Sequence, residues 1–190
     1  GFTAYFAGGC VRDQIMKQAA SDYDIATTAK PEEIEKLFQK TIPVGKQFGV
    51  VIVVEHQMQF EIATFRTEDQ YDDGRHPQTV QFSTPEQDAK RRDFTINGLF
   101  FDPIKEQVVD FVGGQEDIQR KIIRTIGNPK DRFMEDHLRL LRAIRFAANL
   151  DFEIHAETWE AVKKYAPLIT KVSKERIREE LTKMFTRSGA

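Results

Sequence analysis

Cysteine is almost absent from this sequence, since Cys10 is the only one among 190 residues. A single cysteine can form neither an internal disulfide nor a thiolate zinc cluster. No stretch approaches the roughly 20 apolar residues of a membrane span, and the N-terminus lacks the basic region and cleavage site of a secretory signal. We therefore expect a cytoplasmic protein with no membrane partner.

A strong charge of one sign is also lacking, because the formal net charge is −2. This value excludes a surface that is basic all over, but a local basic stripe can still bind RNA phosphates. A hydrophobic share of 40% and 15 phenylalanines are enough for a buried core, so we expect a folded chain. The sequence begins at Gly1 without Met and ends shortly after Phe185, and we expect both ends to be cuts in a longer protein.

Strands and helices alternate in the first part of the chain. Apolar and β-branched runs predict strands at 5–7, 22–26, 50–54 and 59–65, and periodicity predicts helices over 11–19 and 31–38. The segment 66–78 is polar and contains Gly74 and Pro77, which predicts a mobile loop.

From Pro129 the pattern becomes helical. Phe133, Leu140 and Ile144 recur at helical spacing and predict one buried face, and two more helices are expected near 156–166 and 173–185. We expect an α+β fold with two parts: a mixed sheet flanked by helices over 1–128, and an all-helical part over 129–190.

Two carboxylates are expected to lie together. On a strand, residues two apart point to the same side, so Asp22 and Asp24 would face the same space. Oxygen ligands of this kind suit Mg²⁺, which usually keeps waters and bridges to a substrate phosphate. The alternative for an isolated Asp-x-Asp is a solvated strand end.

A glycine pair precedes this motif. Gly8 and Gly9 stand between a predicted strand and helix, where backbone N–H groups can approach a phosphate, and Arg12 could clamp the same phosphate. A purely steric role for the glycines is the alternative. A Walker loop is excluded, because Gly45-Lys46 is followed by Gln47.

Glu61 is a candidate third carboxylate. It lies between apolar neighbours, where a charged group is costly unless it is paired or bound to metal. Three carboxylates on neighbouring strands would complete a two-metal site with ions roughly 3.5–4 Å apart. A glutamate on an edge strand that points to water is the alternative.

Four segments in order resemble the motifs of tRNA nucleotidyltransferases of the bacterial and eukaryotic class, class II, the family of CCA-adding enzymes. They are residues 8–13, the Asp22-x-Asp24 pair, residues 91–99, and Glu135-Asp136-x-x-Arg139. The similarity continues through 142–146 and 175–181, so it covers nearly the whole chain. It implies a polymerase-β-like nucleotidyltransferase head over 1–128 and a helical neck over 129–190. The family's short Leu-Gly-Arg turn is replaced here by residues 16–20, which we expect to alter a surface turn only.

The resemblance also implies roles for individual residues. Asp22 and Asp24 would hold the metals, with Glu61 as the candidate third ligand. Arg91, Arg92, Asp93 and Asn97 match the segment that recognises the ribose. Asp136 and Arg139 match the pair that reads the incoming base, and Arg142 and Arg145 belong to the same nucleotide site.

The base-reading pair has a chemical logic. An aspartate accepts from the exocyclic amine of C or A and an arginine donates to the adjacent ring nitrogen, an edge that G and U do not present. We expect Asp136 and Arg139 to lie side by side on one helix. The alternative is an exposed ion pair worth only about 0.3–0.5 kcal/mol.

The resemblance implies that a tRNA 3′-hydroxyl attacks the α-phosphate of CTP or ATP, with Mg²⁺ as cofactor and no DNA partner. Alternatives are a bacterial poly(A) polymerase, a split enzyme that adds only CC or only A, and an inactive RNA-binding module. The segment 66–78, with Tyr71 and Arg75, favours competence for A. The family's C-terminal tRNA-binding part is not among these residues.

Overall fold

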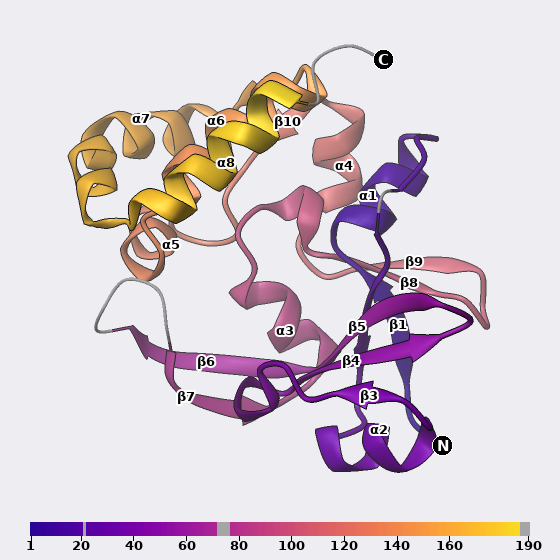
Figure 1. The fold of residues 1–190 in the computed structure, drawn as a ribbon. Coiled ribbons are helices and arrows are strands. Elements are labelled where there is room, and N and C mark those ends of the chain that lie inside the picture. Colours follow the sequence, from indigo (N-terminus) through magenta and orange to yellow (C-terminus); the bar gives the residue numbers. More distant parts are fainter. Residues whose placement is uncertain (21, 72–76, 187–190) are drawn as a thin grey trace.

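The computed structural model of the protein describes residues 1–20, 22–71 and 77–186, with only the backbone of 68–71 and 77–79. Its architecture is α+β, as predicted, with a sheet and its helices followed by a C-terminal group of helices (Figure 1). Within these ranges every helix is too short or too polar to cross a membrane.

The main sheet has seven strands in the order β3-β4-β5-β2-β1-β8-β9. They are β1 Ala4–Ala7, β2 Asp24–Thr27, β3 Thr41–Ile42, β4 Val50–Glu55, β5 Met58–Thr64, β8 Leu99–Asp102 and β9 Gln107–Asp110. Neighbouring strands are antiparallel except β2 and β5, which run parallel. The sheet is therefore mixed, and its one parallel pairing lies near its middle.

Short helices connect these strands. They are α1 Gly9–Ile15, α2 Pro31–Leu37, α3 Pro85–Arg91 and α4 Gly114–Gln119, with 3-10 turns η1 Lys46–Phe48 and η2 Thr95–Asn97. The helix predicted over 11–19 begins and ends earlier, because Lys17 adopts a left-handed φ of 58° that stops it. The strand predicted from Asp22 begins at Asp24, so Asp22 precedes the strand rather than belonging to it.

The prediction of a loop over 66–78 is wrong. β6 Arg66–Tyr71 and β7 Pro77–Phe82 form an antiparallel pair of their own, apart from the main sheet (Figure 1). The two strands satisfy each other's backbone N–H and C=O groups, a pairing that polar composition does not reveal. Residues 72–76, including Arg75, lie outside the described residues.

The C-terminal helices are α5 Pro129–Glu135, α6 Arg139–Leu150, α7 Ala156–Tyr165 and α8 Lys174–Thr186, with a 3-10 segment η3 Ala166–Lys171. The single helix predicted through Asp136 and Arg139 is in fact two, because Asp136 is extended, with φ −145° and ψ 108°. Its carboxylate accepts the N–H of Leu138 at 3.0 Å, a local bond that competes with helix continuation. Phe133 and Leu140 are buried as predicted, whereas Ile144 is 37% exposed.

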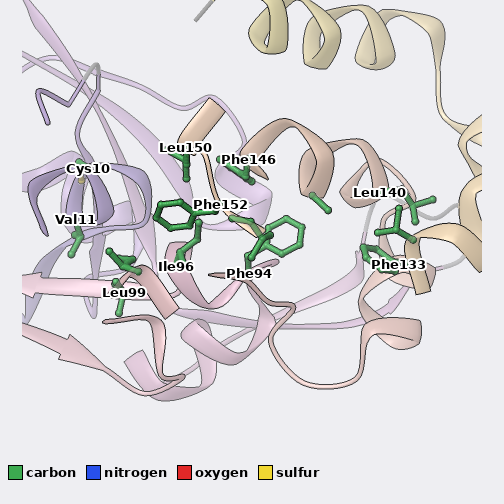
Figure 2. Packing of buried hydrophobic residues seen from close by; sticks show 14 residues of the cluster. Cys10, Val11, Phe94, Ile96, Leu99, Phe133, Leu140, Phe146, Leu150 and Phe152 are labelled. Carbon is green, nitrogen blue, oxygen red and sulfur yellow. The ribbon is translucent and has the colours of Figure 1, made fainter. Parts of the chain in front are cut away.

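One hydrophobic core joins the two parts of the chain. Figure 2 shows it running from Val11 through Ile96 and Phe94 to Phe133 and Leu140. A short parallel pair, β10 Ile122–Ile123 with β11 Glu153–Ile154, adds a backbone link between them. The C-terminal helices are therefore fixed against the sheet, and the functional residues of both parts can share one cavity.

Candidate active site

A cavity of about 810 Å³ lies between the sheet and the C-terminal helices. Every site residue predicted from the sequence lines it. Carboxylates come from the strands, and arginines come from α3, α6 and α8. The cavity therefore brings together an acidic end suited to metal and a basic end suited to phosphates and bases.

The carboxylates meet at the parallel pairing of the sheet. Asp24, the first residue of β2, is the register partner of Glu61 on β5. Because β5 has strands on both sides, Glu61 is not on an edge strand, although its side chain is exposed at the cavity. Asp22 is close enough to act on Asp24 electrostatically.

Desolvation and charge repulsion both act on the pKa of Asp24. Its pKa is raised from 3.8 to about 6, first because the cavity walls desolvate the carboxylate and then because Glu61 and Asp22 repel its charge. Arg92 acts in the opposite direction. A site that carries this excess of negative charge fits a divalent cation.

The carboxylates do not form a finished metal cage. In the described part of the chain, no three acidic, histidine or cysteine side chains converge closely enough to hold an ion alone. Mg²⁺ in phosphoryl-transfer sites is commonly held by one or two carboxylates together with waters and substrate phosphates. The donors therefore suit an ion that binds together with a nucleotide.

The glycine pair lies where β1 turns into α1. Gly8 has a φ of 72°, and a Cβ at this position would stand 3.1 Å from Nη1 of Arg92. Both the left-handed backbone and the approach of that guanidinium favour glycine here. The predicted contact of this turn with phosphate remains a prediction.

Arg12 lines the cavity but is almost completely buried in its wall. It is 4% exposed, and its Nη1 donates to Oδ1 of Asn97 at 2.7 Å. Its Nε and Nη2 donate to Asp13 at 2.8 and 2.6 Å. These bonds tie α1 to η2, and the predicted phosphate clamp is untested.

Asp93 and Asn97 form a connected pair on η2 and the turn before it. Asn97 donates to Oδ1 of Asp93 at 3.3 Å, and Arg142 donates to Oδ2 at 2.8 and 2.6 Å. Burial by itself would raise the pKa of Asp93, but Arg142 and then Arg139 hold it below its ordinary value. The predicted ribose segment is thus fixed to α6 by an ionised carboxylate.

Asp88 holds Arg91 and Arg92, and sequence reasoning missed it. Asp88 is 1% exposed. Its Oδ1 accepts from Arg91 Nε at 2.9 Å and from the backbone N–H of Arg66 at 3.2 Å. Its Oδ2 accepts from Arg92 Nη2 at 3.0 Å. Its only signal in the sequence is its spacing, three and four residues before the two arginines on one helix. Burial would raise the pKa of Asp88, but the two arginines lower it overall.

Asp136 and Arg139, the predicted base-reading pair, are arranged differently from the prediction. Arg139 begins α6, and its Nη1 donates to Oε2 of Glu135 at 2.6 Å. Asp136 pairs instead with Arg176 of α8, through contacts of 3.2 and 2.7 Å. The predicted neighbours on one helix are therefore held by two different partners, one on α5 and one on α8.

Arg145 also points to α8. Its Nε donates to Oε2 of Glu180 at 2.6 Å, and Glu180 is 3% exposed. Burial lowers the pKa of Arg145 below its ordinary value, although Glu180 acts in the opposite direction. Neither Glu180 nor Arg176 was given a role from the sequence, although both lie in the matched segment 175–181.

Comparison with known proteins identifies the family of this chain. The family model described as "Poly A polymerase head domain" matches residues 4–124, and one described as "Probable RNA and SrmB- binding site of polymerase A" matches 151–190. The CCA-adding enzymes of Bacillus pumilus and Bacillus subtilis are 48% and 49% identical over 185 residues, which is 97% of this chain. The chain spans about half the length of these relatives, 46% of each.

Solved structures of CCA-adding enzymes also match this chain. The Bacillus stearothermophilus CCA-adding enzyme in complex with CTP matches with a TM-score of 0.88 and 42% identity, over 97% of this chain and 44% of that one. The Thermotoga maritima CCA-adding enzyme complexed with tRNA matches with a TM-score of 0.79 and 26% identity, over 99% of this chain and 44% of that one. Because the head-domain model matches most of its residues, the chain belongs to the poly A polymerase head-domain family, and within it is similar to class II CCA-adding enzymes.

Proposed function

We propose that the protein adds C and A nucleotides to the 3′ end of tRNA from CTP and ATP, without a nucleic-acid template. The observation that carries this proposal is the single cavity in which the carboxylates of β2 and β5 face the arginines of α3 and α6. Similarity to CCA-adding enzymes over 97% of the chain supports it.

The proposed reaction is attack by the tRNA 3′-hydroxyl on the α-phosphate, with release of pyrophosphate. The 3′-oxygen forms a bond to the α-phosphorus as the bond from that phosphorus to the oxygen bridging to the β-phosphate breaks, and the hydroxyl proton passes to water. Members of this family are typically metal-dependent, and here Asp22, Asp24 and Glu61 would hold Mg²⁺. Bound metal would lower the pKa of the hydroxyl and neutralise charge on the phosphates.

The protein's own groups would position the nucleotide. Arg91 and Arg92, with Asp93 and Asn97, would contact its ribose and phosphates. Asp136 would accept from the exocyclic amine of C or A, and Arg139 would donate to the ring nitrogen beside it. Positioning of this kind supplies much of the barrier reduction in phosphoryl transfer.

We also propose a division into a catalytic head, 1–128, and a neck, 129–190. The change from sheet to helices supports this division. The shared core of Ile96, Phe94, Phe133 and Leu140 indicates that the two parts unfold together. Cytoplasmic localisation and the absence of a DNA partner belong to the same proposal.

The deciding experiment supplies tRNA that ends at the discriminator base, with CTP and ATP separately and together, followed by sequencing of the 3′ ends. Addition of CCA from both nucleotides supports the proposal. Long A tails would indicate a poly(A) polymerase, and addition of only CC or only A would indicate a split enzyme. RNA binding without any incorporation would indicate an inactive module.

A further inference from the structure

Arg176 makes a two-point contact with Asp136 across the cavity. Its Nη1 lies 3.2 Å from Oδ1 and its Nη2 lies 2.7 Å from Oδ2, so both carboxylate oxygens are engaged. The two side chains are 20% and 18% exposed. Partial burial strengthens such charge-assisted bonds, and the fork of a guanidinium fixes the plane of the carboxylate it holds.

A third bond completes the support of this carboxylate. Oδ1 of Asp136 also accepts the backbone N–H of Leu138 at 3.0 Å. An ionised carboxylate has about four acceptor sites, so these three bonds leave about one for a ligand. The carboxylate is therefore fixed in direction and able to accept one further hydrogen bond.

The position of Arg176 is itself fixed by α8. Glu180 lies one turn further along the same face of this helix and is bound to Arg145 at 2.6 Å, with Arg142 at 3.6 Å. Glu180 is 3% exposed, so this anchor is inside the protein. Helix α8 thus presents a cation to Asp136 and an anion to the arginines of α6.

We propose that Arg176 is a positioning residue for base selection, acting through Asp136. This inference rests on the proposed function, because Asp136 selects bases only if the cavity binds nucleotides. A fixed carboxylate accepts from the amine of C or A and opposes the carbonyl of U or G. Without Arg176 the carboxylate can turn away, and the mismatch with U or G costs less.

A competing idea makes different predictions. In this idea Arg176 does no more than pair with Asp136 while no nucleotide is bound, so the incoming base would have to displace Arg176. Removing Arg176 would then tighten binding of CTP and ATP and leave the preference over UTP and GTP unchanged. The two ideas differ in selectivity, which does not depend on the fraction of protein that is folded.

The test compares wild type, Arg176→Ala, Arg176→Lys and the control Arg178→Ala. Arg178 lies on the same helix and is exposed. Dissociation constants for all four nucleotides and single-turnover incorporation into tRNA are measured for each protein. Arg176→Ala should lower the preference for CTP over UTP by about ten- to hundredfold, the effect of losing a hydrogen bond to a charged group. Arg176→Lys keeps the charge but loses the forked guanidinium, so its preference for CTP over UTP should lie between those of wild type and Arg176→Ala.

If Arg176→Ala keeps the wild-type preference for CTP over UTP, the proposal is overturned, whether or not the nucleotides bind more tightly. An equal loss of this preference in Arg178→Ala also overturns it. If Arg176→Ala fails to fold, the selectivity of Arg176→Lys decides in the same way. Failure of the proposed function looks different: wild-type protein would then incorporate no C or A into tRNA. The nucleotide dissociation constants would still test Arg176 in that case.

Discussion

Asp24 and Glu61 are register partners in the one parallel pairing of the main sheet. Two acidic side chains at neighbouring positions on adjacent strands repel each other, and like charges directly opposite are destabilising in sheets. The pKa of Asp24 is raised to about 6, first by desolvation and then by this repulsion. A bound cation would relieve it.

Substitution of Asp22 or Asp24 by Ala should abolish nucleotide incorporation while leaving the fold nearly intact, because the charges that are removed repel one another. Incorporation into tRNA and the thermal unfolding midpoint are measured together. Retention of more than about a tenth of wild-type turnover, equivalent to under 1.4 kcal/mol of barrier, would show that these residues are not metal ligands.

The metal-free protein should lose stability as pH rises from about 4 to about 6 through Asp24. Its folded pKa, about 6, lies above the ordinary 3.8, so the folded state holds the proton longer and its relative stability falls across this window. Mg²⁺ should restore stability above pH 6 and bind more weakly below it. Urea unfolding at several pH values checks this, with Asp24→Asn as the control. If the same fall in stability between about pH 4 and about pH 6 persisted in Asp24→Asn, the pH dependence would belong to another group.

Shortening the β6–β7 pair should separate C addition from A addition. Deletion of residues 69–76 should leave CC addition working and remove the terminal A, if this segment adapts the site for the larger base. Replacement of 72–76 alone by glycine and serine is the matched control. Equal loss of both steps would indicate a general scaffold role.

Asp136→Ala should relax base choice, raising the use of UTP and GTP relative to CTP and ATP. A site built for hydrogen bonds rejects mismatched groups strongly, so removing its acceptor weakens that rejection. Arg139→Ala should instead weaken use of both correct nucleotides. Single-turnover incorporation of all four nucleotides distinguishes these effects, and an unchanged preference in Asp136→Ala would refute the assignment.

Asp88→Ala should be costly for stability as well as activity. It would leave Arg91 and Arg92 without the buried carboxylate that they share, and breaking a buried ion pair costs about 3–5 kcal/mol. Glu86→Gln, on the same helix, loses only an exposed pair with Lys90 and should change little. The free energy of unfolding from urea titrations compares the two. Equal values would mean that Asp88 does not hold these arginines.

Features encoded in short stretches were predictable. The β-branched run at Val50 and the position of Glu61 between apolar residues each report a strand, and both strands are present. The acidic pair and the glycine pair were assigned from residue type and spacing, and all of these residues line the cavity.

Features that depend on which hydrogen-bond partner a group finds were not predictable. Apolar spacing through Asp136 looks like a continuous helix, because periodicity records which residues are buried and not where a side chain binds a nearby backbone N–H, as Asp136 binds that of Leu138. The pairing of β6 with β7 escaped notice for a related reason, since strand pairing satisfies backbone groups whatever the polarity of the side chains.

The residue types along the chain were enough to specify an acidic strand end, a glycine turn, a mixed sheet and the family motifs, because each depends on neighbours a few positions apart. The partners of the charged groups came from the folded chain: Arg176 reaches Asp136 across 40 residues, and Arg142 reaches Asp93 across 49. An arginine can satisfy any nearby carboxylate, so spacing in the sequence does not select its partner. The packing of α6 against the shared core, and of α8 against α6, decides which carboxylates lie within reach of each guanidinium.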